Sequence, residues 1–169
     1  MGKLVIKFKP THYADDSDIC NLIAYIAGHG AKKEQTILYH NANGLSKNYK
    51  KVPTQMIQVQ RYFNKSSKRR IYHMIVSFPC NYVYNERFII ETANSIAKQC
   101  FPYHQSFYAV HNATDNLHIH FAINAVNHKT GKKWHKSKDE FSELKKDILH
   151  IINHLHCQYK LPYCDYLYL

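Results

Sequence analysis

The chain has 169 residues and carries 23 Lys and Arg against 12 Asp and Glu, a formal net charge of +11 with its 13 histidines neutral. This length predicts a single domain over 1–169, and 45% apolar residues suffice for a core, which excludes a disordered chain. No stretch approaches the ~20 apolar residues of a membrane helix, and the N-terminus lacks a signal peptide's apolar run. We therefore expect a cytoplasmic protein without a membrane partner.

The predicted elements mix strands and helices. In chain order they are a strand over 3–9, a helix over 17–27, a polar, turn-rich stretch over 39–51, a helix over 53–63, a basic loop over 64–70, a strand over 71–78, a helix over 85–100, strands over 106–111 and 117–126, and a helix over 137–158. The two strands before the last helix flank a short turn and predict a hairpin. This order predicts an α+β fold, an antiparallel sheet of four or five strands with helices packed mainly on one face.

Two long segments of the chain contain no acidic residue. The first lies between Glu34 and Glu86 and the second between Asp115 and Asp139, and both are rich in Lys and Arg. One such run is typical of a solvated surface, but two within a strongly basic domain favour contact with nucleic acid, because phosphates bind where acids are absent. The predicted DNA contacts are Lys65, Lys68, Arg69, Arg70, Lys132 and Lys133.

Three histidines are predicted to meet on one face of the hairpin. His118 and His120 stand two apart in a strand, so both point to the same face about 6–7 Å apart. His111 falls roughly opposite His118 across the turn, where cross-strand neighbours lie about 5 Å apart. An open set of three imidazoles is typical of a catalytic metal site rather than a closed structural one. Asn124 lies on the same side of the strand.

These segments are similar to a known family. Residues 111–127, followed by Lys-Thr-Gly-Lys-Lys at 129–133, resemble motif III of the conjugative relaxases, the relaxase and mobilisation nuclease group of the HUH endonucleases, in its MOBP-like branch. Residues 71–78 resemble the central Tyr-His…Ser-Phe strand of that family. Ala-Tyr-Ile at 24–26 resembles the N-terminal motif that carries the nucleophilic tyrosine. The similarity runs from about residue 20 to 161.

The resemblance implies an HUH relaxase palm that holds a divalent ion, Mn²⁺ or Mg²⁺, on His111, His118 and His120. It also implies that Tyr25 attacks DNA, forming a 5′-phosphotyrosine, and that the enzyme nicks and rejoins one strand. The implied partner is single-stranded or hairpin DNA at a transfer origin, with accessory relaxosome proteins beside it, in conjugation or mobilisation of a plasmid or integrative conjugative element. Position alone does not single out Tyr25 among 14 tyrosines, and Tyr13 is the next candidate.

The surroundings of the three histidines depart from the family pattern. Relaxases commonly have an acid two residues after the first histidine, where this chain has Ala113, so Asp115 is the remaining acid that can orient a ligand. They also commonly have a histidine where this chain has Asn116. His73 is either a residue at the edge of the site or an ordinary strand residue, and the sequence leaves both interpretations open.

Two other functions fit parts of this pattern. A rolling-circle replication initiator or transposase uses the same metal hairpin, but those groups generally place the tyrosine after the histidines, whereas Tyr25 precedes them. A non-enzymatic, basic single-strand DNA-binding module would use the histidines for a structural ion. The chain is either a whole protein or the N-terminal nuclease part of a longer one.

Overall fold

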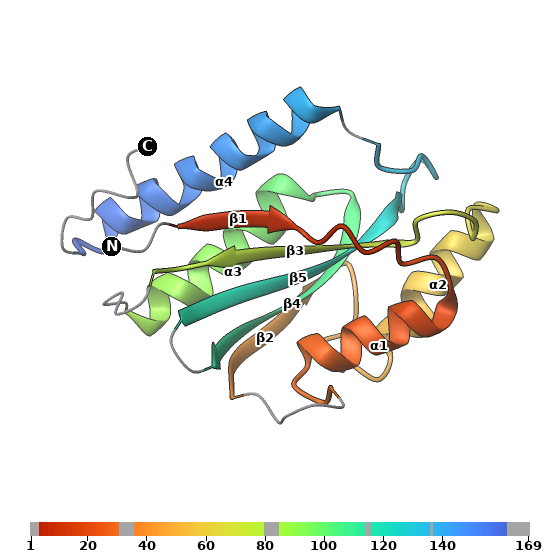
Figure 1. The fold of residues 1–169 in the computed structure, drawn as a ribbon, viewed down its shortest axis with the longest axis horizontal. Coiled ribbons are helices and arrows are strands. Elements are labelled where there is room, and N and C mark those ends of the chain that lie inside the picture. The colour runs from red at the N-terminus through yellow and green to blue at the C-terminus, as the bar shows by residue number, and fades with distance from the viewer. Residues whose placement is uncertain (1–3, 31–35, 80–84, 114–115, 136, 162–169) are drawn as a thin grey trace.

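The computed structural model describes residues 4–30, 36–79, 85–113, 116–135 and 137–161. Within these residues the chain forms one antiparallel sheet with the strand order β1-β3-β5-β4-β2, together with four helices (Figure 1). The strands are β1 (Val5–Phe8), β2 (Ile37–Asn43), β3 (Ile71–Ser77), β4 (His104–Ala113) and β5 (Asn116–Asn127). The helices are α1 (Asp16–Ile26), α2 (Val52–Tyr62), α3 (Glu86–Cys100) and α4 (Lys138–Gln158). The predicted α+β class is confirmed.

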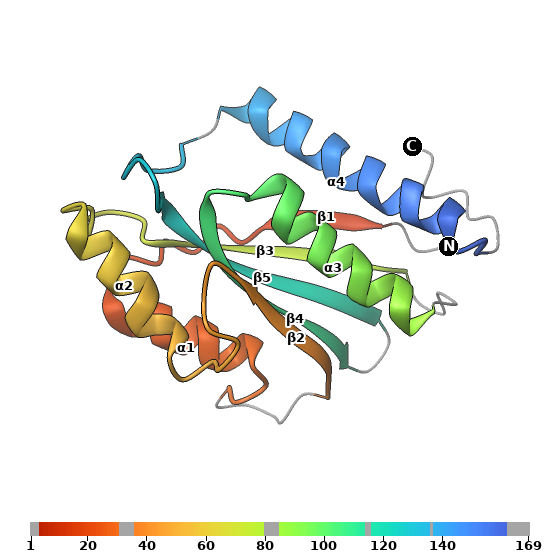
Figure 2. The same cartoon turned by 180° about the vertical axis from the view of Figure 1, so that it is seen from behind.

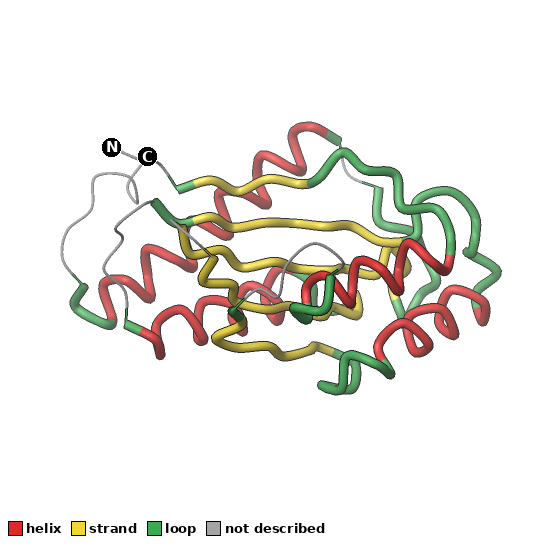
Figure 3. The backbone as a smooth tube through the Cα atoms, turned by 60° about the horizontal axis from the view of Figure 1, so that its bottom comes forward, coloured by secondary structure: helices red, strands yellow, loops and turns green. Residues whose placement is uncertain are grey.

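A pair of helices covers each face of the sheet, so the expectation of helices mainly on one face was wrong in this detail. The helix α3 passes behind the sheet in Figure 1 and in front of it in Figure 2, and Figure 3 shows α1 lying across the strands. Phe121 of β5 packs in the core under α3 and α4, and Ala122 packs in a second core with α1 and α2. Because β5 buries the residues on both of its faces, it needs cover on both sides.

The edge strand β2 was not predicted from the sequence, which reads as polar and turn-rich there. Besides the apolar packing of Ile37 and Ala42, its side chains are attached to α3 by hydrogen bonds. The Tyr39 hydroxyl donates to Asn94 Oδ1 (3.1 Å), and Asn41 Nδ2 donates to the same oxygen (3.0 Å). Tyr108 of β4 also donates to Asn94 (2.8 Å). Polar pairing of this kind leaves no alternating apolar signal in the sequence.

The helix ends follow from their capping residues. Helix α1 begins after Asp15 rather than at Ser17, because the Asp15 carboxylate accepts from the Asp18 amide in a capping box. Helix α4 begins at the predicted capping box of Ser137 and Glu140, which is confirmed. Among the helices of the described ranges, none has the length and apolar character needed to cross a membrane.

Candidate active site

Three histidines lie on the face of the sheet that α1 covers. His111 of β4 and His118 of β5 are direct partners in the hairpin register, and His120 follows on the same face of β5. The ring centroids of His111 and His120 lie 4.4 Å apart, and those of His118 and His120 lie 6.0 Å apart. The structure therefore brings the three imidazoles together, and the period of two along β5 accounts for their common direction.

Burial keeps these imidazoles neutral. The pKa of His120 falls from its ordinary value to about 2, first because the ring is buried and then because His111 and His73 lie close to it. Burial also lowers the pKa of His111 and of His118. A neutral imidazole has a lone pair on one ring nitrogen, and this is the form that binds metal ions or accepts protons.

The hydrogen bonds of His111 show which of its nitrogens holds the proton. Its Nε2 lies 2.7 Å from the carbonyl oxygen of Ile26, at the end of α1. Since a carbonyl can only accept, Nε2 donates and the lone pair is on Nδ1. The Nδ1 atoms of His111 and His118 are both buried without a hydrogen-bond partner among the described residues. Both nitrogens are therefore available to a ligand of the cluster.

A divalent ion fits the chemistry of this donor set. Imidazoles with unpartnered nitrogens are suitable ligands for a transition-metal ion such as Mn²⁺ and less so for Mg²⁺, which prefers oxygen. As the side chains lie, no three imidazole, thiol or carboxyl groups of the described ranges surround a common point at ligand distance. For these three rings to share an ion, they would have to turn from the positions seen here.

His73 belongs to the same cluster, on the neighbouring strand β3. Its Nε2 lies 2.9 Å from Nδ1 of His120, and its Nδ1 lies 3.3 Å from the hydroxyl of Tyr13. Burial, followed by the charge of Lys9, lowers the pKa of His73 to about 4. The structure places His73 in contact with His120, and a role for His73 at the site stays a prediction.

The ring of Tyr25 projects from α1 toward this cluster. Its centroid lies 5.6 Å from that of His120, 6.0 Å from that of His73 and 6.1 Å from that of His111. The ring is half-buried, and a Cβ added at Gly30 would lie 3.1 Å from Tyr25 Cδ2, so the absence of a side chain at Gly30 lets the chain pack against the tyrosine. Tyr25 is thus held beside the imidazoles rather than free on the helix surface.

A cavity of about 350 Å³ opens in front of Tyr25 and His73. Tyr13, Lys9 and Asn21 also line it, none of which the sequence singled out as a lining residue. The signal for Asn21 was its position four residues before Tyr25, which places the two on one helix face. No comparable signal marks Lys9, whose place depends on the pairing of β1 with β3.

Comparison with known proteins agrees with this geometry. Residues 25–157 match the family model of the relaxases described as the MobA/VirD2-like nuclease domain. The chain belongs to this relaxase family. It is 30% identical over 73% of its length to one Escherichia coli protein TraI and 28% identical over 79% to another. The chain spans only 17% and 18% of these two relatives, so it corresponds to a small part of each.

A solved structure shares the fold of this relaxase domain. It comes from work titled "Molecular Basis of Vancomycin Resistance Transfer in Staphylococcus aureus", with a TM-score of 0.66 over 94% of both chains and 14% sequence identity. At this identity the likeness concerns the fold alone. The family assignment implies a DNA endonuclease of conjugative transfer, and relaxase nucleases are generally metal dependent.

Two predicted site residues, Asn124 from the histidine hairpin and Arg70 from the basic run, lie in a buried polar cluster away from the three histidines. Asn124 Oδ1 accepts from Gln60 Nε2 (2.9 Å), and Gln60 in turn accepts from Arg70. Arg70 is only 4% exposed and forms an ion pair with Asp16 (2.6 Å). Arg70 is therefore placed as part of the core rather than on a DNA-binding surface, because its side chain is buried and its guanidinium pairs with Gln60 and Asp16. Asp115 lies outside the described residues.

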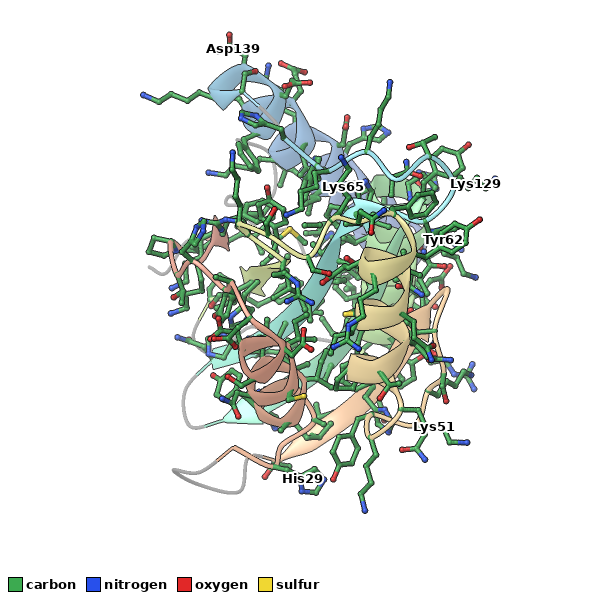
Figure 4. The ribbon with its side chains drawn as sticks, turned by 90° about the vertical axis from the view of Figure 1, so that its right-hand side faces the viewer. His29, Lys51, Tyr62, Lys65, Lys129 and Asp139 are labelled. Atoms are coloured by element: carbon green, nitrogen blue, oxygen red, sulfur yellow. The ribbon has the colours of Figure 1, made fainter. Side chains whose placement is uncertain are left out.

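The other five predicted DNA contacts come from two segments that are distant in the sequence and lie side by side in the structure. Lys133 Nζ donates to the backbone carbonyls of Ser67 and Arg69, which ties the loop before β3 to the loop before α4. Burial and then the nearby charges of Arg70, Lys65 and Lys68 lower the pKa of Lys133, which shows how closely these cations are packed. Figure 4 views this end of the molecule, where Lys65 and Lys129 project with the exposed Tyr62.

Lys68 and Lys132 are exposed in these two loops, and Arg69 is half-buried. The five cations Lys65, Lys68, Arg69, Lys132 and Lys133 thus remain together at one end of the sheet. Repulsion among cations this close is relieved when phosphates bind between them.

Proposed function

We propose that this relaxase domain nicks one strand of single-stranded or hairpin DNA at a transfer origin through attack by the Tyr25 hydroxyl. The observation that supports this most directly is the position of the Tyr25 ring, within 5.6–6.1 Å of three imidazole rings, facing a cavity. A cavity of about 350 Å³ is large enough for the sugar and phosphate of a nucleotide. Tyr25 and His73 then both border the phosphate, because both line the cavity.

The reaction exchanges one phosphodiester for another. The Tyr25 oxygen bonds to phosphorus as the bond from phosphorus to the 3′ oxygen breaks, and the proton lost by the phenol is balanced by the one the 3′ oxygen gains. The products are a 5′-phosphotyrosine and a free 3′-hydroxyl. Because the number and kind of bonds are conserved, the same residues can rejoin the strand by the reverse step.

The proposed ligands of a divalent ion are His111, His118 and His120, whose neutral rings present lone pairs at the site. Such an ion, when bound, supplies positive charge to a non-bridging phosphate oxygen. His73 holds the His120 ring through the hydrogen bond between them, which fixes the direction of that imidazole. The burial of the three rings favours Mn²⁺ over Mg²⁺, which gives up its water reluctantly.

A covalent-adduct assay tests the nucleophile. The wild type with Mn²⁺ and a verified origin strand should give a protein-DNA adduct that survives denaturing electrophoresis, and Tyr25→Phe should give none while keeping DNA affinity. Tyr13→Phe is the matched control, since Tyr13 lines the same cavity and should still permit the adduct. An adduct in Tyr25→Phe would show that another residue attacks. Absence of an adduct in every variant would instead favour the binding-module function.

Titration calorimetry with Mn²⁺ tests the ligands separately. His118→Ala should weaken Mn²⁺ binding at least tenfold, whereas His154→Ala, on the exposed side of α4, should leave it unchanged. Equal affinity in His118→Ala and the wild type would contradict the proposed ligand set.

A further inference from the structure

A second cavity, of about 320 Å³, lies next to the one in front of Tyr25. The rings of Phe8, Tyr72 and Phe141 line it, together with Lys9, Arg69 and His135. Lys9 lines both cavities, and its charge also acts on His73. Lys9, which follows β1, is therefore common to the lining of both cavities, so a chain that contacts Lys9 lies beside each of them.

The walls of this second cavity combine flat rings with cations. The guanidinium of Arg69 lies over the Tyr72 ring, 5.0 Å from its centroid. The Tyr72 hydroxyl donates to the carbonyl of Trp134 (2.8 Å), and the Tyr72 ring packs edge-to-face against the Trp134 ring. These contacts fix the Tyr72 ring before any ligand binds, so little side-chain entropy is lost on binding.

The charge of the cavity favours one class of ligand. None of its lining residues is acidic, and it borders the cationic loop that holds Lys65 and Lys68. An apolar peptide would leave the charges of Lys9 and Arg69 without a partner, and a free anion would make no use of three aromatic rings. A nucleotide suits both the rings and the cations of this cavity. Its base stacks on the rings and the guanidinium, and its phosphate pairs with the cations.

We propose that this aromatic cavity holds one unstacked base of the DNA strand, whose backbone passes Lys9 on its way to the phosphate in front of Tyr25. The proposal rests on the proposed function only in that DNA is the ligand, since it requires no chemistry by Tyr25. Stacking on Tyr72 and Arg69 tolerates any base, so the cavity adds affinity rather than a choice of sequence. It also draws one base out of the stack beside the reacting phosphate.

Fluorescence anisotropy with two probes of equal charge tests this cavity. The probes are a labelled oligothymidylate and an abasic strand of the same length, both bound to the Tyr25→Phe protein so that no adduct forms. The preference for the strand with bases should fall about tenfold in Tyr72→Leu, while binding of the abasic strand stays within twofold. An undiminished preference in Tyr72→Leu would overturn the proposal.

The matched control is Tyr103→Leu, because Tyr103 also lies under a cation, with Lys129 Nζ 4.6 Å from its ring centroid, but does not line the cavity. It should keep the preference within twofold of the parent. If Tyr103→Leu loses as much as Tyr72→Leu, general aromatic contact rather than this cavity explains the preference.

A second measurement avoids substitutions, in case Tyr72→Leu unfolds. Strands with 5-iodouracil in place of thymine, irradiated on the otherwise native protein, should crosslink to Phe8, Tyr72, His135 or Phe141, as mapped by mass spectrometry of the peptides. Crosslinks confined to other residues would overturn the proposal. Loss of the adduct with these crosslinks intact would instead overturn only the tyrosine chemistry.

Discussion

The two faces of the central sheet differ in what they bury, although the same strands build both. On the face toward α3 and α4, residues such as Phe121 and Ile119 pack with apolar helix side chains. On the face toward α1 and α2, the alternate residues include His73, His120 and Asn124, all buried. The face toward α3 and α4 is thus mainly apolar, whereas the face toward α1 and α2 combines an apolar core with buried imidazoles and a buried amide.

The histidine face is costly to bury. Its imidazoles lose hydration, which is the first cause of the lowered pKa of His73 and His120. The apolar face has no such cost and offsets it with the burial of large side chains. Substitutions on the two faces should therefore have different consequences for stability and for activity.

The largest expected effect on stability is on the apolar face. Phe121→Ala removes a fully buried ring, and the cavity left behind should lower the free energy of unfolding by about 3–5 kcal/mol. Urea denaturation followed by circular dichroism measures this change. Leu38→Ala, at an exposed position on β2, is the control and should cost less than about 1 kcal/mol. Similar losses in both variants would contradict the role of Phe121 in the core.

Lowering the pH should reduce the free energy of unfolding, because the buried imidazoles of the histidine face resist protonation in the folded state. In the metal-free protein, unfolded His73 binds a proton below about pH 6.5, whereas the folded residue has a pKa of about 4. The free energy of unfolding is therefore retained above pH 6.5 and falls as the pH is lowered toward 4. Between pH 6.5 and 5 the loss for His73 alone is about 2 kcal/mol. Urea midpoints across this range, with a chelator present, measure it.

His73→Gln should reduce the number of protons taken up on unfolding between pH 6.5 and 4 by about one. His154→Gln, at an exposed position, is the control substitution. A wild-type midpoint that does not move between pH 7 and 5 would contradict the burial of neutral imidazoles.

On the side of the sheet that α1 and α2 cover, two arginines pair with the carboxylate of Asp16, one buried and one exposed. Arg70 is buried, and its removal leaves Gln60 Oε1 without a donor, so Arg70→Met should cost about 1–3 kcal/mol. Arg61 pairs with the other oxygen of Asp16, but its side chain is 67% exposed, so Arg61→Met should cost less than about 1 kcal/mol. Denaturant unfolding of both variants decides the matter; equal losses would refute the structural role assigned to Arg70.

The smallest expected effect concerns the cationic loops. Lys68→Gln should leave the free energy of unfolding within about 0.5 kcal/mol but weaken binding of single-stranded DNA. The slope of log affinity against log salt concentration should fall by about 0.7 for the lost phosphate contact. A salt series in fluorescence anisotropy measures this slope, and an unchanged slope would remove Lys68 from the DNA surface.

Much of the fold was accessible from the sequence because its signals are local. The apolar stripes of the helices, the capping box at Ser137 and the strand 71–78 all depend on neighbouring residues. Strand β2 escaped prediction because its residues give no alternating apolar pattern, and its place depends on pairing with β4 and on hydrogen bonds to Asn94, both far along the chain. Arg70 was assigned to the surface because it stands in a basic run, and only its pairing with Asp16 and Gln60 shows that it is buried.

The sequence by itself determined the histidine hairpin, since the pleat directs His118 and His120 to one side and a short turn sets His111 opposite. It also determined that the basic segments contain no acid. Only the tertiary structure decided that α1 lays Tyr25 against those histidines, and that Lys133 joins the two basic segments. The physical reason is that such contacts join residues far apart in the chain, whose meeting depends on how helices and strands pack rather than on any local periodicity.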